Sequence, residues 1–233
     1  MLKFEDSTLE KAVLSGESCI AVPLEVFLKS DGETEILTYS FCEKEAKEFC
    51  KKFGGTPFSD EALSFADRVF GEKLRGLGYE HYAHEGELMR EYILSSEDSL
   101  PLVSHKVRMI STNEELSPLC ENTGCEIELN DDGEDLLFAV VQDGEILAYA
   151  GMNDVQYADG SVEISVETSP DYRRQGLGIT CVTELCRHIL KKGNSVRYKS
   201  AKSNLASCAL AEKCGFSLVG ERYSYICGIA EDS

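Results

Sequence analysis

The segment from Ser161 to Lys192 constrains the fold more than any other, because a strand pattern passes into a helix pattern through a glycine-bearing loop. Residues 161–168 alternate strictly between polar and apolar, which is the period of a half-buried strand. Residues 177–192 carry apolar side chains at helical spacing, and Gly193 predicts the end of that helix. The pattern predicts a β-strand that leads directly into a helix, as in α/β sheets.

The loop between this strand and helix has the composition of an anion-binding turn. Gly176 and Gly178 allow a tight turn in which several N–H groups point outward without obstruction by a Cβ atom. Such a turn at a helix N-terminus binds phosphate, and Arg173 and Arg174 add positive charge. A Walker loop and a dinucleotide fingerprint fit less well, because the Gly-Lys-Ser/Thr ending and a third glycine are missing. An ordinary glycine turn that caps the helix is the alternative.

Two motifs together resemble the GCN5-related N-acetyltransferase (GNAT) superfamily. The run Arg173-x-x-Gly176-x-Gly178 is similar to the family's Arg/Gln-x-x-Gly-x-Gly/Ala loop. Asn204, Ser207 and the Ala-Glu-Lys-Cys-Gly-Phe run at 211–216 resemble its Asn-x-x-Ser/Ala…Glu-Lys-x-Gly-Phe block, in the form of a bacterial branch. The resemblance covers about residues 105–229 and leaves the first hundred residues unexplained.

The resemblance implies acetyl-CoA as cosubstrate, lying along the strand before the loop. The main chain of Val166 and Thr168 is then expected to pair with the pantetheine amides, as an added strand would. Asn204 and Ser207 match positions that contact the pantetheine side. The loop and first helical turn are expected to hold the pyrophosphate through these residues: Arg173, Arg174, Gln175, Gly176, Leu177, Gly178, Ile179 and Thr180.

Acetyl transfer to an amine requires removal of a proton, because a primary amine with a pKa of about 10 is mostly protonated at neutral pH. Glu163 and Glu167, on the polar face of the strand, are the candidate bases. Glu163 is preferred, since family bases on this strand lie several residues before the loop. A solvated strand carboxylate is the alternative for each. Many relatives carry a tyrosine general acid where this chain has Ala211, so no catalytic acid is assigned.

Two functions follow from the resemblance. The first is an N-acetyltransferase that moves acetyl from acetyl-CoA to an amine, in a small molecule or a peptide, by direct attack in a ternary complex. The second is a catalytically weak GNAT-fold module that binds acetyl-CoA as a sensor or interaction domain, which Ala211 keeps open. The residues do not identify the acceptor.

The rest of the chain predicts an α/β (α+β) fold with a mixed, mostly antiparallel central sheet and helices on both faces. Helices are expected at 43–53, 60–77, 113–120 and 205–214, and strands at 88–94, 107–110, 136–141, 146–151, 196–200, 216–219 and 222–227. Residues 20–28 form an apolar run. The turn Asp143-Gly144 between two apolar runs predicts a hairpin.

The predicted division is an N-terminal α/β region, residues 1–104, and a GNAT acetyltransferase domain, residues 105–233. A polar run at 95–99 closed by Pro101 is the expected linker. Residues 66–92 and 205–226 share a faint helix, Gly-aromatic and strand pattern. The first region is therefore interpreted as a possible degenerate copy of the second.

Forty-two acidic and 23 basic residues give a net charge of −19, which disfavours nucleic acid and anionic membranes and favours cationic partners. Solubility alone is the alternative. No apolar run approaches a membrane span of about 18 residues and the start of the chain does not resemble a signal peptide, so a cytoplasmic location is expected. The expected oligomeric state is a monomer or a homodimer. The ten cysteines form no Cys-x-x-Cys pair and the run His81-x-x-His84-Glu85 lacks a third ligand, so no metal is expected.

Overall fold

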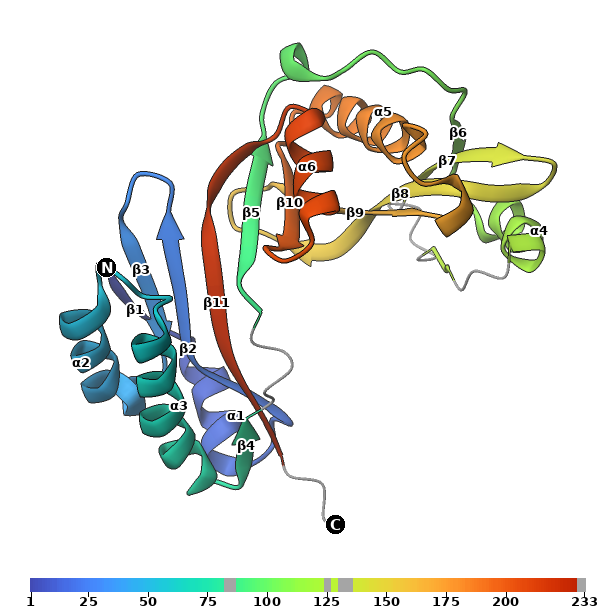
Figure 1. Cartoon of the computed structure of the whole chain (residues 1–233). Coiled ribbons are helices and arrows are strands. Elements are labelled where there is room, and N and C mark those ends of the chain that lie inside the picture. The colour runs from blue at the N-terminus through green and yellow to red at the C-terminus, as the bar shows by residue number, and fades with distance from the viewer. Residues whose placement is uncertain (82–86, 124–126, 130–135, 230–233) are drawn as a thin grey trace. The chain divides into compact units, whose positions relative to one another are not determined.

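The computed structural model describes residues 1–81, 87–123, 127–129 and 136–229, and these form two compact units (Figure 1). The first unit comprises Met1–Arg90, Ala201–Ser203 and Val219–Ser233; the second comprises Glu91–Ser200 and Asn204–Leu218. The domain division at residues 104 and 105 stays a prediction, since compactness does not test which segment folds by itself.

The sheet of the second unit has the strand order β5-β10-β9-β8-β7-β6. Its strands are β5 (Met89–Leu94, in this unit from Glu91), β6 (Arg108–Ile110), β7 (Leu137–Gln142), β8 (Glu145–Gln156), β9 (Val162–Thr168) and β10 (Val196–Ala201, in this unit to Ser200). The pairs from β6 to β9 are antiparallel, whereas β9 and β10 are parallel. The prediction of a mixed, mostly antiparallel sheet is confirmed.

The described residues of this unit form three α-helices, which are α4 (Asn113–Thr123), α5 (Leu177–Lys191) and α6 (Leu205–Lys213), and the short 3₁₀ turns η2 (Glu97–Ser99) and η3 (Pro170–Tyr172). Phe138 and Val140 of β7 belong to the same core as α5, and Leu137 and Ala139 to the core that contains Leu116 of α4. Since successive strand residues point to opposite faces, helices cover both faces of the sheet, as predicted.

The hairpin between β7 and β8 forms at the predicted Asp-Gly turn. Asp143 and Gly144 have φ values of 53° and 84°, and a turn with two positive φ values matches the twist of paired strands. This hairpin supplies two of the strands on which β9 is built.

The first unit has strands in the order β1-β3-β2-β11, with β4 also paired to β11. Its elements are β1 (Leu2–Phe4), α1 (Ser7–Ser15), β2 (Ile20–Lys29), β3 (Thr34–Thr38), the 3₁₀ turn η1 (Ser40–Cys42), α2 (Glu43–Phe53), α3 (Asp60–Arg75), β4 (Tyr79–His81) and β11 (Ser217–Ile229, in this unit from Val219). The Ser59 hydroxyl caps α3 by accepting from the Ala62 N–H. The apolar face of the helices packs on the strands through Phe49, Phe70, Leu24 and Ile36. The interpretation of this region as a degenerate copy stays a prediction.

The last strand differs from the prediction. Two strands, 216–219 and 222–227, were expected on either side of Gly220, but β11 is continuous from Ser217 to Ile229. A Cβ atom on Gly220 would lie 2.5 Å from the carbonyl oxygen of Leu28 in β2. The glycine therefore allows close approach of two strands rather than a break between them.

Candidate active site

A cavity of about 780 Å³ opens in the second unit where β9, the loop after it, the start of α5, and α6 meet. It contains eleven of the residues that the sequence predicts for the site: Val166, Glu167, Thr168, Arg173, Arg174, Gly176, Leu177, Gly178, Ile179, Asn204 and Ser207. Glu163, Gln175 and Thr180 do not line it. Residues that lie about 40 positions apart in the chain are thus brought to one cavity.

One side of the cavity is an open edge of β9. The parallel register with β10 runs from Val162 only to the pair of Ile164 with Tyr198, while β8 stays paired as far as Thr168. The Val162 N–H donates to the Ser195 carbonyl, and the Ser169 N–H, seven residues on, donates to the Leu147 carbonyl in the opposite direction.

The direction of the intervening peptide groups follows from their alternation along a strand. The N–H groups of Val166 and Thr168 point in the same direction as that of Val162, away from β8. They lie on the edge of β9 that is no longer paired with β10. An extended ligand with amide groups can pair there as an additional strand.

The loop residues take the backbone conformation of an anion-binding turn. Arg174 and Gly176 have φ values of 63° and 82°, and Gly176 is the N-cap of α5. Among the residues that the structure describes, no side chain caps this helix, so the N–H groups of its first turn, beginning at Leu177, can bind a ligand. The guanidinium of Arg173 donates to the Thr168 carbonyl over 3.2 Å and fixes the loop to the end of β9.

The two glycines are required for different reasons. A Cβ atom on Gly176 would lie 3.9 Å or more from its neighbours, so there the constraint is the positive φ. A Cβ atom on Gly178 would lie 3.0 Å from the Thr168 hydroxyl and 3.3 Å from a methyl group of Leu210. Gly178 therefore allows α5 to approach both β9 and α6.

Gln175 and Thr180 do not line the cavity, but each makes a contact that stabilises the loop. The buried Thr180 hydroxyl donates to the Gly176 carbonyl over 3.0 Å. The Gln175 carbonyl lies 3.1 Å from His105 Nε2, a contact that joins the loop to the segment before β6. Sequence reasoning gave His105 no role, because nothing in the sequence places residues 104–105 beside the loop.

The start of α6 forms the opposite wall. The Asn204 side chain caps this helix by accepting from the Ser207 N–H over 3.1 Å. The Ser207 hydroxyl lies 2.8 Å from the hydroxyl of Tyr198, which also lines the cavity. Tyr198 was missed by sequence reasoning, although the alternating burial of β10 would place it on the same face as Val196. Ala211 is fully buried in α6.

Glu163 is a restrained carboxylate. It accepts hydrogen bonds from Asn153 and Tyr157 and pairs with the Lys199 ammonium at 3.2 Å, and its side chain is only 13% exposed. Burial acts to raise the pKa of Glu163, but these hydrogen bonds and the Lys199 charge outweigh it, so the pKa lies below its ordinary value. The carboxylate oxygens of Glu163 are therefore occupied by neighbouring donors and are poorly placed to accept a proton from a substrate.

Glu167 is the more accessible carboxylate. It is exposed, lines the cavity and accepts a hydrogen bond from Tyr149 over 2.9 Å. One carboxylate oxygen is therefore oriented by a neighbour, while the group stays in contact with solvent at the cavity edge.

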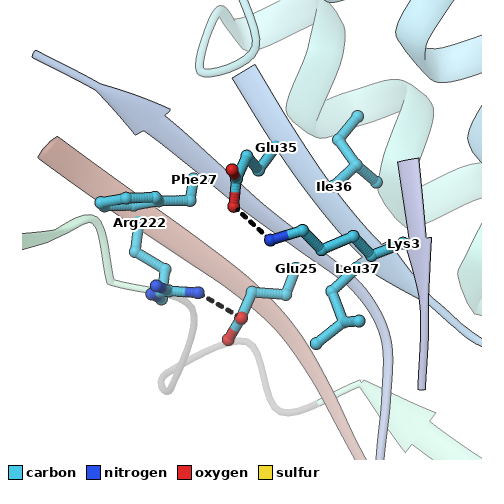
Figure 2. A pocket seen from close by; sticks show the side chains of 7 residues that line it. All are labelled: Lys3, Glu25, Phe27, Glu35, Ile36, Leu37 and Arg222. Atoms are coloured by element: carbon cyan, nitrogen blue, oxygen red, sulfur yellow. Dashed lines mark hydrogen bonds and ion pairs between the residues drawn. The ribbon is translucent and has the colours of Figure 1, made fainter. Parts of the chain in front are cut away.

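A second cavity, of about 90 Å³, lies on the strands of the first unit (Figure 2). Lys3 pairs with Glu35 at 2.8 Å, and Arg222 pairs with Glu25 while its guanidinium stacks on Phe27. These opposite charges satisfy one another within a space of about three water molecules. It is therefore a poorer candidate for a functional site than the large cavity.

In the part of the chain that the structure describes, no three His, Cys, Asp or Glu side chains gather as metal ligands. The run His81-x-x-His84-Glu85 extends into residues 82–86, which lie outside the described residues. None of the described helices combines the length and the apolar character of a membrane span.

Residues 107–216 match the acetyltransferase (GNAT) family. This segment contains both predicted motifs and every residue that lines the large cavity. The GNAT resemblance is thus supported, whereas the finer assignment to one bacterial branch stays a prediction.

Two known proteins show the extent of the likeness. The [Ribosomal protein bS18]-alanine N-acetyltransferase of Escherichia coli is 32% identical over 91 residues, which are 39% of this chain and 60% of that protein. This chain therefore matches only about 60% of the length of the curated relative. A GNAT-family protein of Novosphingobium aromaticivorans is 21% identical and superposes with a TM-score of 0.50, covering 66% of this chain and 69% of the other. That likeness supports the GNAT fold.

Proposed function

We propose that the chain is an N-acetyltransferase that moves acetyl from acetyl-CoA to an amine by direct attack in a ternary complex. The observation that carries this proposal is the large cavity, which combines an open strand edge with an uncapped helix N-terminus. An extended amide-bearing arm and a pyrophosphate suit these two features together. A cytoplasmic location and a monomeric or homodimeric state are part of the proposal.

The proposed binding mode of acetyl-CoA follows from the open edge of β9 and the N-terminus of α5. The pyrophosphate binds the amides of residues 174–179 and the guanidinium groups beside them, favoured by the helix dipole. The pantetheine arm pairs with the main chain of Val166 and Thr168, and Asn204 and Ser207 flank it. No metal takes part in this proposal.

For the base, accessibility supports Glu167 over Glu163. A base must lie within hydrogen-bond reach of the amine or one water molecule away. Glu167 lines the cavity, whereas Glu163 accepts from three donors and has a lowered pKa. Glu163 is proposed to order β9 and β10, and Glu167 to receive the proton.

A peptide N-terminus is the acceptor class that this arrangement favours. The curated relative is an alanine N-acetyltransferase of a ribosomal protein, as its name states. An α-amino group has a pKa of about 7.7–8.0, so a sizeable fraction is neutral near pH 7.5 and an exposed carboxylate or water is a sufficient base. The net charge of −19 further favours acceptors with cationic neighbours.

The alternative is a catalytically weak GNAT-fold module that binds acetyl-CoA as a sensor. Ala211, in the place of the tyrosine acid of many relatives, and the internally paired Glu163 both favour it. Cosubstrate binding is common to both functions, so turnover separates them.

The test combines calorimetric titration with acetyl-CoA and a mass-spectrometric screen of peptides and small amines. Binding together with acetylation of at least one amine supports the enzyme. Binding without acetylation across the panel supports the sensor. Absence of binding contradicts both.

A further inference from the structure

Tyr198 is the only tyrosine among the described residues that line the large cavity. Its ring is held between Tyr92 and Phe216, with ring centroids 6.5 Å and 5.7 Å away, and the residue is 3% exposed. Its hydroxyl lies 2.8 Å from that of Ser207. The ring is therefore held by two aromatic neighbours and the hydroxyl group by one polar neighbour.

The position of Tyr198 along β9 is equally defined. It pairs with Ile164, the last β9 residue in register with β10, directly before the open stretch that contains Val166 and Thr168. A ligand whose phosphates lie at the start of α5 and whose arm follows β9 runs from Thr168 toward Ile164. Four residues of strand span about 13 Å. The far end of such an arm therefore arrives at Tyr198.

We propose that the Tyr198 hydroxyl donates a hydrogen bond to the sulfur of acetyl-CoA and stabilises the thiolate as it leaves. This rests on the proposed function. Either hydroxyl can donate in the contact between Tyr198 and Ser207; in the proposed arrangement Ser207 donates to the Tyr198 oxygen, which leaves the phenol hydrogen for the sulfur. Tyr198 thus takes over, from β10, a role in leaving-group stabilisation that Ala211 in α6 cannot fill.

The step balances without a full proton transfer from tyrosine. The amine nitrogen attacks the thioester carbonyl, a C–N bond forms, the C–S bond breaks, and the sulfur leaves with the electron pair as a hydrogen-bonded thiolate. The amine's proton passes to Glu167 or water, and the thiolate finally takes a proton from solvent. Burial raises the pKa of Tyr198, so the phenol stays protonated as a donor where the thiol, with a pKa of about 8.5, is ionised.

Other charged groups of the cavity are less suited to this contact. Lys213 is exposed and lies six residues, about 9 Å, beyond Ser207 along α6. Glu167 is an acceptor when ionised and repels a thiolate. Arg173 and Arg174 lie in the loop beyond Thr168, at the opposite end of β9 from the pair of Ile164 and Tyr198.

The test compares CoA with acetyl-CoA by calorimetry at pH 9, where most of the free thiol is thiolate. Tyr198→Phe is expected to weaken CoA binding about tenfold or more, because a hydrogen bond to a charged group is lost, and acetyl-CoA binding less than about twofold. Tyr92→Phe is the matched control, since it removes a neighbouring hydroxyl outside the cavity lining, and it should change neither affinity. Circular dichroism establishes that each variant is folded.

Every result decides the proposal. If a folded Tyr198→Phe variant loses affinity equally for CoA and acetyl-CoA, or loses none, the thiolate contact is overturned. The proposed function then still stands, because the parent protein binds acetyl-CoA. Failure of the parent to bind either ligand overturns the proposed function as well. If Tyr198→Phe does not fold, the parent decides: its affinity for CoA relative to acetyl-CoA must rise between pH 7 and pH 9, and a constant ratio contradicts the thiolate contact.

Discussion

The Glu163 carboxylate and the Lys199 ammonium face each other between β9 and β10 at 3.2 Å. Lys199 follows Tyr198 in β10, and because successive strand residues point to opposite faces, its side chain lies on the other face of β10 from that of Tyr198. The ion pair thus lies on the face of β10 opposite to the Tyr198 side chain. It holds β9 and β10 together just before they separate.

We predict that Glu163→Gln is a stability variant. The substitution leaves the partly buried Lys199 without its ionic partner, so the free energy of unfolding should fall by about 1 kcal/mol at pH 7. Because folding lowers the pKa of Glu163, its contribution is present above the unfolded value of about 4.3 and is lost as pH falls through the folded value. Urea unfolding should therefore give a parent–variant difference that is constant from pH 8 to about pH 5 and shrinks below pH 4. A hundredfold loss of turnover in a stable Glu163→Gln protein would instead identify it as the base.

Glu167→Gln is expected to be an activity variant. Loss of the accessible carboxylate should lower turnover about tenfold or more near pH 7 while the affinity for acetyl-CoA stays within twofold, since general-base assistance typically contributes more than tenfold. The deficit should diminish as pH rises past about 8, where a larger fraction of the amine is neutral. Steady-state rates against pH, with Glu163→Gln as the matched strand carboxylate, provide the measurement. A deficit that grows with pH would exclude the base role.

Arg173 and Arg174 should contribute unequally to acetyl-CoA binding. The Arg173 guanidinium donates to the Thr168 carbonyl, so Arg173→Ala removes a loop contact as well as a positive charge. We expect Arg174→Ala to weaken binding by about 1 kcal/mol and Arg173→Ala by up to about 3 kcal/mol. Titration at two salt concentrations tests the electrostatic part, because screening should reduce the Arg174 effect. Equal and salt-independent losses would speak against this division.

The strand, loop and helix from Ser161 to Lys191 could be predicted because three local signals agree there. The polar alternation, the glycine pair and the helical spacing each act over a few residues, and β9 and α5 form within one residue of the predicted bounds. Short elements were harder. In α1 only Val13 is buried, so the segment lacks a continuous apolar face, and its helix depends on the Asp6 cap instead.

Tyr198 and His105 could not be predicted, since their places depend on long-range register. Nothing local in the sequence states that β10 leaves β9 after the pair of Ile164 and Tyr198, or that residue 105 lies behind the loop. At Gly220 the prediction of a break between two strands was wrong, because this glycine allows β11 and β2 to approach closely. Glu163 and Glu167 share one strand face in the sequence and differ only in their neighbours.

The glycine pair offers the sharpest test of the phosphate site. Gly176 has a φ of 82°, which a β-branched residue adopts only with strain, so Gly176→Val should distort the turn that lines the cavity. We expect acetyl-CoA affinity to fall at least tenfold. Gly193 is the matched control: its φ is 88°, a Cβ atom there meets nothing within 4 Å, and it follows the other end of α5.

Gly193→Val should therefore carry a similar backbone cost without a loss of affinity. Thermal unfolding of both variants should show comparable destabilisation, which separates strain from binding. Calorimetric titration with acetyl-CoA then compares the two at a temperature where both are folded. If Gly176→Val binds as tightly as Gly193→Val, the turn at the start of α5 is not the phosphate site, and the cosubstrate must be held elsewhere.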